Sequence, residues 1–510
     1  MPEHLKALVV ILLLASLVFA IARKASYELI GQADFLRRRN LWFGLVIAAF
    51  LAHNYWIYIV IASLLVLVAS ARETNRIALF FVVLFVVPAT TLEIPGFGLI
   101  NFLFAVGHVR LLELLILFPL FLRLRQRNDI SKFGKFKTDI ILSIYLVLVF
   151  LLQLRETTVT DTLRQGLYLF IDVFLPYYVI SRALQEIHDF KSALYGFVLA
   201  SMVLALLGMF EFAKHWQLFS SWFGAVGMPH DYFGYSLREG RLRASASIGH
   251  SLAFGYVIVV AVGFYIYLSR FISNPLYRRL GWALLAGGAV ASLSRGPWVG
   301  VLVLFVVFLA TGTNALRRLA MLGFAGVLSL PLLAVMPGGE KVIDLLPFIG
   351  TVDKFNVDYR DKLIGQTTIV INRNPWFGAV DFAQAPEMQQ MIQGEGIIDV
   401  TNSYLLMALQ IGYVGTGLFV GFFAFVAWGV FSGFRLLLDL DSEEYLLGRA
   451  LLATLLAVLF IIATVSPITV IPVVYWSVAG LGVAYAQMCR RMQMQEHANI
   501  AWQGSMIRHT

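Results

Sequence analysis

Between two polar segments the chain reads Leu252-Ala-Phe-Gly-Tyr-Val-Ile-Val-Val-Ala-Val-Gly-Phe-Tyr-Ile-Tyr-Leu268, without a single charged side chain. A helix crosses the hydrocarbon core of a bilayer with roughly 20 apolar residues, and this stretch comes close to that length. Comparable apolar stretches recur from one end of the sequence to the other. They predict an all-α polytopic membrane protein rather than a soluble domain with one buried helix.

The composition of the whole chain supports this fold class. Of 510 residues, 59% are hydrophobic and only 14% are charged, and the mean hydropathy is +0.80. An average soluble domain is about 45–50% apolar and about 25% charged, so this chain has too little charge to cover a water-facing surface. A soluble enzyme, a disordered chain and a disulfide scaffold are therefore excluded. The one cysteine, Cys489, allows no intramolecular disulfide and argues against a Cys/His metal cluster.

Apolar stretches bounded by polar residues give the predicted membrane spans. The spans are Leu5–Ala22, Ile77–Thr91, Leu111–Leu124, Ile140–Leu154, Leu163–Ile180, Ala193–Phe212, Leu252–Leu268, Leu280–Leu293, Pro297–Leu309, Leu319–Met336, Val414–Phe431, Leu451–Val465 and Val470–Met488. One further stretch, Leu41–Ser70, is longer than a single span needs. The total is about 14 transmembrane helices if that stretch is one tilted helix and about 15 if it is two.

The charges around Leu41–Ser70 favour two helices. His53-Asn54 interrupts the stretch near its middle, and arginines flank both of its ends, at 37–39 and at 72 and 76. Cytoplasmic loops of membrane proteins carry an excess of Lys and Arg. A hairpin turning at His53-Asn54 keeps both arginine clusters on the cytoplasmic side, whereas a single span would export one of them. We therefore predict a hairpin.

The same charge rule orients the chain and accounts for most of its net charge of +9. It places the N-terminus outside, the C-terminus inside and the basic segment Arg123–Lys137 in the cytoplasm. Residues 337–400 carry five basic and nine acidic residues, which fits an external loop. The predicted domains are a helix bundle at 1–336 with an outer loop at 214–250, a long periplasmic loop at 337–401, C-terminal transmembrane helices at 402–490 and a cytoplasmic tail at 491–510.

Charged residues inside the predicted spans are few. Arg110 and Glu113 are three residues apart, as are Glu211 and Lys214, and each pair is expected to meet on one helical face. A proton-coupled transporter would place more acidic residues near mid-membrane. Their scarcity counts against the transporter class.

A minority of arginines breaks the charge rule by lying on the predicted outer side. Arg295 stands between two predicted spans in Ser294-Arg295-Gly296, where it is either a snorkelling anchor or an anion clamp. Arg238, Arg241 and Arg243 come just before another span. They either form a solvated face at the lipid headgroups or make bidentate contacts to phosphate. His250, which follows them, is expected to be an interfacial histidine.

The long outer loop adds turn and cap residues. Asn374-Pro375 and Gly378 are typical of a turn, and Thr401 or Asn402 is expected to cap the helix that follows. The sequence contains no metal-ligand spacing, phosphate-binding glycine loop, nucleophile elbow or dinucleotide fingerprint.

Together and in this order, these stretches resemble the O-antigen ligase and polymerase superfamily of bacterial envelope membrane proteins. The resemblance covers roughly residues 230–415, and the many-span layout extends it along the chain. It implies a membrane fold like that of the C-type glycosyltransferases. The matching segments are Ser294-Arg295-Gly296, Arg360 at the start of the long loop, Asn374-Pro-Trp-Phe-Gly378, Thr401-Asn-Ser-Tyr-Leu405 and Gly412.

One position departs from the family pattern. The family's loop ends in a His-Asn-Ser-Tyr-Leu run whose histidine is regarded as catalytic in ligases, and this chain has Thr401 in its place. The departure argues against a lipid A-core ligase and favours a polymerase of repeat units. It also leaves the catalytic base unassigned, with Asp399 and Glu395 as the nearby carboxylates.

The resemblance implies glycan transfer at the periplasmic face of the bacterial inner membrane, from an undecaprenyl diphosphate carrier to a sugar hydroxyl of an acceptor. The diphosphate is a good leaving group, so catalysis needs positioning and charge stabilisation, and neither a metal nor a cofactor is expected. Arg295 and Arg360 are expected to hold the diphosphate, and Asp399 to act as general base. The expected substrate-binding residues are Arg241, Arg243, Asn402, Tyr404 and Trp376.

Three functions compete. The favoured one is a polymerase of O-antigen or exopolysaccharide repeat units, and a ligase acting on a lipid core or protein acceptor is the second. The third is a transporter or flippase for lipid-linked oligosaccharide, which should show a polar path across the membrane. The expected partners are the lipid-linked glycan, an acceptor glycan and membrane lipid, with a chain-length regulator left open and no nucleic acid.

Overall fold

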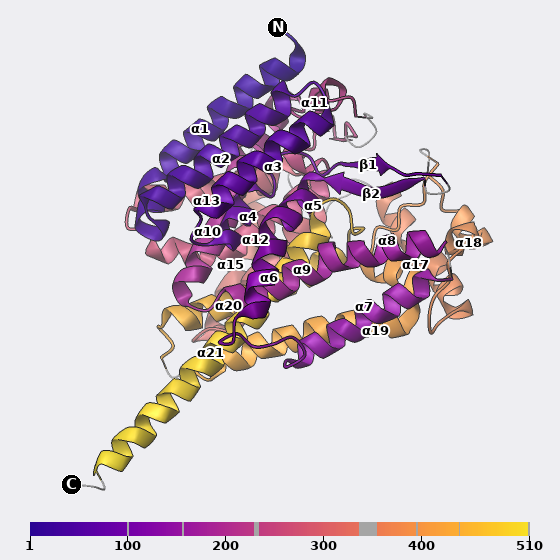
Figure 1. Ribbon diagram of the computed structural model, residues 1–510. Coiled ribbons are helices and arrows are strands. Elements are labelled where there is room, and N and C mark those ends of the chain that lie inside the picture. Colours follow the sequence, from indigo (N-terminus) through magenta and orange to yellow (C-terminus); the bar gives the residue numbers. More distant parts are fainter. Residues whose placement is uncertain are drawn as a thin grey trace.

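The protein is a bundle of helices, seen in the computed structural model of Figure 1. The structure describes residues 1–98, 101–155, 158–228, 234–335, 354–393, 396–437 and 439–507. Within these ranges the only strands form two short two-stranded sheets. The predicted all-α polytopic membrane fold is confirmed.

The helices follow the predicted apolar stretches closely over most of the chain. Single π-helical turns join α5 to α6 and α8 to α9. The helices are α1 (Glu3–Ile30), α2 (Gln32–Leu51), α3 (Tyr55–Ala71), α4 (Arg76–Val83), α5 (His108–Leu112), α6 (Phe118–Gln126), α7 (Lys137–Gln153), α8 (Val159–Tyr168), α9 (Leu175–Ala183), α10 (Ile187–Lys214), α11 (Ser220–Ala225), α12 (Ser251–Leu268), α13 (Pro275–Ala291), α14 (Arg295–Ala310), α15 (Ala315–Val335), α17 (Lys354–Arg373), α18 (Pro386–Gln389), α19 (Ser403–Arg435), α20 (Glu443–Ile462) and α21 (Ile471–Ile507).

Six helices in the described ranges are long and apolar enough to cross a membrane unaided. Most of the other predicted spans also contain helices, some of them shorter or joined through a π-helical turn, and the total of 14 or 15 spans stays a prediction. The six are Glu3–Ile30, Ile187–Lys214, Ser251–Phe271, Ser403–Arg435, Glu443–Ile462 and Ile471–Gln495.

The predicted span Ile77–Thr91 is wrong. Helix α4 ends at Val83, and strand β1 (Thr91–Pro95) begins where the span was expected to finish. Pro88 has no backbone N–H to donate and therefore favours a break in the helix. Strand β1 pairs antiparallel with β2 (Phe102–Gly107) in a hairpin that the apolar pattern concealed.

The predicted break at His53-Asn54 is confirmed. Helix α2 ends at Leu51 and α3 begins at Tyr55, where the side-chain oxygen of Asn54 accepts a hydrogen bond from the backbone N–H of Trp56 at 2.7 Å. At the far ends of the two helices the buried guanidinium of Arg38 lies 2.7 Å from the carboxylate of Glu73. The charged segments that flank the stretch therefore meet at one end of the bundle, as a hairpin requires.

Replacement of Asn54 by alanine is expected to lower the free energy of unfolding by about 1 kcal/mol, because the cap acceptor of α3 is lost. Asn54→Asp keeps the acceptor and should unfold almost as the wild type does. Thermal unfolding in detergent measures both. Equal destabilisation by the two substitutions would contradict a capping role.

The loops gather at two opposite ends of the bundle. At one end Lys191 pairs with Glu443 at 2.6 Å, and Arg491 donates to the backbone oxygen of Gln185 at 3.1 Å. At the other end Arg155 donates to the backbone oxygen of Phe377 at 3.0 Å. Figure 1 shows the two termini at opposite ends of the molecule. Which of the two ends faces the cytoplasm stays a prediction.

Helix α12, which contains the charge-free stretch 252–268, lies in the middle of the bundle. Nearly all of its side chains are buried. It packs against α10, α13, α14 and α20. This charge-free stretch therefore contacts protein rather than lipid.

The two predicted local ion pairs are replaced by longer-range contacts. Arg110 binds the carboxylate of Asp172 through two of its nitrogens, at 2.8 and 3.0 Å. Glu211 lies next to the loop before α12 and accepts hydrogen bonds from the backbone N–H groups of Leu218, Ser245 and Ala246 at 2.8–3.1 Å. A buried carboxylate needs such donors, and the folded loops supply them where the helix itself could not.

Candidate active site

A cavity of about 1040 Å³ opens at the end of the bundle where the predicted outer loops gather. Its wall comes from the loop before α12, the segment before α19 and the turn between α20 and α21. Segments far apart in the chain thus build one site. Its polar lining includes Arg243, Ser245, His250, Asp399, Thr401 and Ser466.

The Ser294-Arg295-Gly296 motif is fixed beside this cavity by close packing. Ser294 is fully buried, and its hydroxyl accepts a hydrogen bond from Arg243 at 2.9 Å. A Cβ atom at Gly296 would lie 2.5 Å from the hydroxyl of Thr464, so glycine permits α14 to approach the end of α20. Arg295 is the first residue of α14, so the contacts made by its neighbours Ser294 and Gly296 fix its position.

Four arginines converge next to this motif. Arg238 donates to the backbone oxygen of Leu293 at 2.5 Å, two residues before Arg295. Arg360, on α17, donates to the backbone oxygen of Thr464 at 3.3 Å. Burial lowers the pKa of Arg360, an effect that Asp399 opposes and that the positive charges of Arg238 and Arg295 reinforce. These arginines are therefore near enough to repel one another.

The carboxylate of Asp399 lies near these arginines and carries the opposite charge. Its Oδ1 accepts a hydrogen bond from the hydroxyl of Ser466 at 2.7 Å. The backbone oxygen of Asp399 accepts one from the hydroxyl of Tyr359 at 3.1 Å, which ties the segment to α17. With Arg243, the described residues of the site include four arginines and this carboxylate, so an anion with several charges would be stabilised there.

His250 was expected at the membrane interface, but it lies in the cavity wall. Its Nδ1 is buried and has no hydrogen-bond partner among the described residues. Burial, and then the positive charge of Arg243, lower its pKa to about 4, although Asp399 acts in the opposite direction. The imidazole is therefore neutral at neutral pH.

The structure brings together only some of the residues predicted from the sequence. Arg243 and Asp399 line the cavity, and Arg295 and Arg360 interact beside it. Glu395, the second carboxylate considered, lies outside the described residues. Ser466 is an addition that the sequence did not single out, and His250 was expected only as an interfacial histidine. Both are near the site only through packing of distant segments.

Four residues that were predicted to bind the substrate make other contacts in the structure. The hydroxyl of Tyr404 donates to the backbone oxygen of Leu459 at 2.9 Å, so it joins α19 to α20. Asn402 caps α19 by accepting from the N–H groups of Tyr404 and Leu405, as predicted for a cap. Arg241 is exposed, with its guanidinium 5.9 Å from the ring of Phe212. Trp376 is 68% exposed. None of the four lies in the cavity wall described above.

The turn that carries Trp376 has a structural role. Gly412 interrupts α19 with φ 67° and ψ −173°. The backbone N–H of Tyr413 donates to the oxygen of Pro375 at 2.7 Å, and that of Val414 donates to the oxygen of Trp376 at 3.2 Å. The loop thus fills the break in α19, which explains why the Asn-Pro turn and the later glycine occur together.

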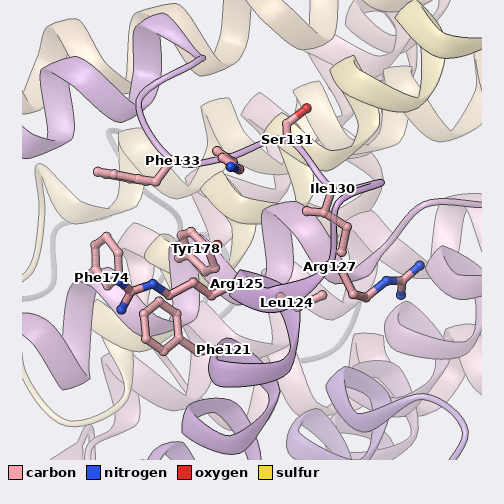
Figure 2. A pocket seen from close by; sticks show the side chains of 10 residues that line it. Phe121, Leu124, Arg125, Arg127, Ile130, Ser131, Phe133, Phe174 and Tyr178 are labelled. Atoms are coloured by element: carbon pink, nitrogen blue, oxygen red, sulfur yellow. The ribbon is translucent and has the colours of Figure 1, made fainter.

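A second cavity, of about 310 Å³, is lined by the predicted cytoplasmic segment and α9. Figure 2 shows Arg125 beside the rings of Phe121, Phe174 and Tyr178, with Arg127 directed away from them. Its lining has basic and aromatic side chains but no carboxylate or histidine. It therefore lacks the proton acceptors that Asp399 and His250 give the larger cavity, which we take as the candidate active site.

The fold and this cavity define a polytopic helical membrane protein with an arginine-flanked cavity. Residues 280–420 match the family model described as O-antigen ligase. The matched region contains Arg295, Arg360, Asp399 and Gly412. Over this region the match confirms the resemblance to the O-antigen ligase and polymerase superfamily that the motifs indicated. No curated protein matches the sequence.

Proposed function

We propose that this protein polymerises glycan repeat units at the periplasmic face of the bacterial inner membrane. Its family indicates a glycan transferase of the ligase or polymerase type. The donor would be an oligosaccharide linked to undecaprenyl diphosphate, and the acceptor the terminal sugar of a second lipid-linked unit. The observation that carries the proposal is the convergence of four arginines next to a cavity of about 1040 Å³.

The charges suit a diphosphate leaving group. Arg295 and Arg360 would hold the phosphates, with Arg243 as a third contact from the cavity wall. Guanidinium groups bind phosphate oxygens in a bidentate manner, and they stabilise the charge that develops as the sugar–phosphate bond breaks. In the proposed site Asp399 faces the acceptor and assists its deprotonation. The chemistry needs no metal ion, because the arginines supply the positive charge.

A ligase is the second candidate, and the description of the matched family favours it. Against it stands Thr401, which lies in the cavity wall where the family pattern has a histidine. A ligase would pass the glycan to a lipid core or a protein. Both functions use the same donor and the same arginines, so the acceptor separates them.

Purified protein in liposomes should extend an undecaprenyl diphosphate oligosaccharide into a ladder of longer glycans without nucleotide or added metal. Gel separation of the glycans released from the lipid measures the ladder. Transfer of one unit to an added lipid core, with no ladder, would show a ligase instead. Movement of the oligosaccharide between leaflets without any new glycosidic bond would exclude the enzyme and favour a transporter.

A further inference from the structure

We propose that His250 accepts the proton of the attacking sugar hydroxyl, with Asp399 stabilising the imidazolium that forms. The inference rests on the proposed glycan transfer and names the base that the sequence left unassigned. It is carried by the position of the imidazole, by its unpartnered nitrogen and by the charges on either side of it.

The backbone fixes His250 at the edge of the cavity. The residue before it, Gly249, has φ 83° and turns the chain into α12. The backbone oxygen of His250 accepts a hydrogen bond from Phe254 at 2.9 Å, in the first turn of that helix. Because α12 is packed on all sides, the imidazole is held on a rigid element, as a group that transfers protons needs to be.

The imidazole has a nitrogen available for a substrate. The Nδ1 atom is buried without a hydrogen-bond partner in the described part of the chain. A buried polar atom with no partner costs free energy, and a ligand hydroxyl in the adjoining cavity would satisfy it. The ring is neutral at neutral pH, since burial lowers its pKa to about 4. Neutral imidazole can accept a proton.

The surrounding charges couple the basicity of His250 to donor binding. In the free protein Arg243 disfavours a positive imidazole, and Asp399 favours one. A diphosphate bound to the arginines would offset the charge of Arg243. The pKa of His250 would then rise toward the range in which a general base is efficient, and would do so only when the donor is in place.

The proposed transfer forms one bond, breaks one bond and moves one proton to His250. The oxygen of the acceptor hydroxyl forms a bond to the anomeric carbon of the donor while its proton moves to His250. The bond from that carbon to the phosphate oxygen breaks, and its electron pair leaves with undecaprenyl diphosphate, next to Arg295 and Arg360. The imidazolium then returns its proton to solvent or to the departing diphosphate.

His250 and Thr401 line the same cavity from different segments. His250, on the loop before α12, can therefore act as a base in the same cavity in which the family's histidine would act from the segment before α19. Asp399 is the competing base, but its Oδ1 is already engaged by the hydroxyl of Ser466. Its negative charge near the imidazole is better suited to stabilising the protonated ring.

The test compares His250→Gln with wild-type protein in the liposome assay. We expect kcat to fall by roughly 100-fold while the KM for the lipid-linked donor stays nearly unchanged, as for loss of a general base. Added imidazole should restore part of the activity of the variant. His53→Ala removes a histidine whose Nδ1 donates to the backbone oxygen of Leu51 at 3.0 Å, and it should be fully active and insensitive to imidazole.

The amount of folded protein is measured for each variant, and rates are given per folded molecule. Wild-type kcat in His250→Gln would overturn the inference while leaving the proposed function intact. So would a loss of activity that imidazole does not relieve and that comes with weaker donor binding, since that pattern indicates a structural role. A wild-type protein that transfers no glycan would overturn the proposed function, and this inference with it.

Discussion

Replacement of Arg360 by alanine should reduce kcat/KM for glycan transfer by roughly 100- to 1000-fold, the range found when one preorganised donor to a developing charge is removed. Arg360 lies on α17 and interacts with Asp399, Arg238 and Arg295. Its guanidinium is partly buried next to other positive charges, which costs free energy. Binding of an anionic diphosphate would relieve that repulsion, so the loss on substitution should be large.

Three matched variants sharpen this prediction. Arg295→Ala should cause a loss of similar size, since it removes a second guanidinium from the same group. Arg360→Lys keeps the charge but loses the planar fork, and should fall between wild type and alanine. Arg373→Ala, at the other end of α17, removes an exposed arginine that pairs with Glu387, and activity should hardly change.

Steady-state transfer rates at several donor concentrations provide the measurement. Full activity in both Arg295→Ala and Arg360→Ala would disprove the site assignment. Losses as large in Arg373→Ala would point to a general sensitivity of the loop and not to anion binding.

Replacement of Gly412 by alanine is expected to have the largest effect on folding. The backbone at Gly412 has φ 67° and ψ −173°, a region that is open almost only to glycine and costs other residues about 1–3 kcal/mol. A Cβ atom there would lie 2.3 Å from the backbone of Trp376. Because the neighbour is main chain and cannot rotate away, the loop would have to leave the break in α19.

Gly417→Ala is the control for this prediction. Gly417 lies one and a half turns further along α19, and a Cβ atom there meets nothing within 4 Å. Alanine should be neutral or stabilising by up to about 1 kcal/mol, as in an ordinary helix. Thermal unfolding in detergent and transfer activity are measured for both variants. Equal stability of the two would show that the loop does not depend on the break at Gly412.

Much of the fold could be predicted because its signals are local. Apolar stretches of adequate length predict helices whatever they pack against, and Asn54 marks a helix start through its own backbone neighbours. The wrong span at Ile77–Thr91 shows the limit of this logic. A continuous apolar pattern does not distinguish a helix from a buried turn followed by a strand, and only the pairing of β1 with β2 decided between them.

The candidate site was predicted in part for the same reason. Arg295 could be singled out because an outer-side arginine violates a rule that applies to each loop separately, and Arg360 because it matches the family pattern. The roles of Tyr404 and Trp376 could not be predicted, because a polar or aromatic residue in a family motif can serve packing as well as substrate. In the structure Tyr404 hydrogen-bonds to α20, and Trp376 belongs to the loop that fills the break in α19.

The sequence by itself determined that this is a membrane protein of many helices, because burial of apolar side chains away from water depends on composition and run length alone. It also determined that several arginines lie on one side. The tertiary structure alone decided that stretch 252–268 is the centre of the bundle and that His250 lies near Arg243 and Asp399. Electrostatic interactions act through space over a few ångströms, and residues separated by 149 positions in the chain come that close only after folding.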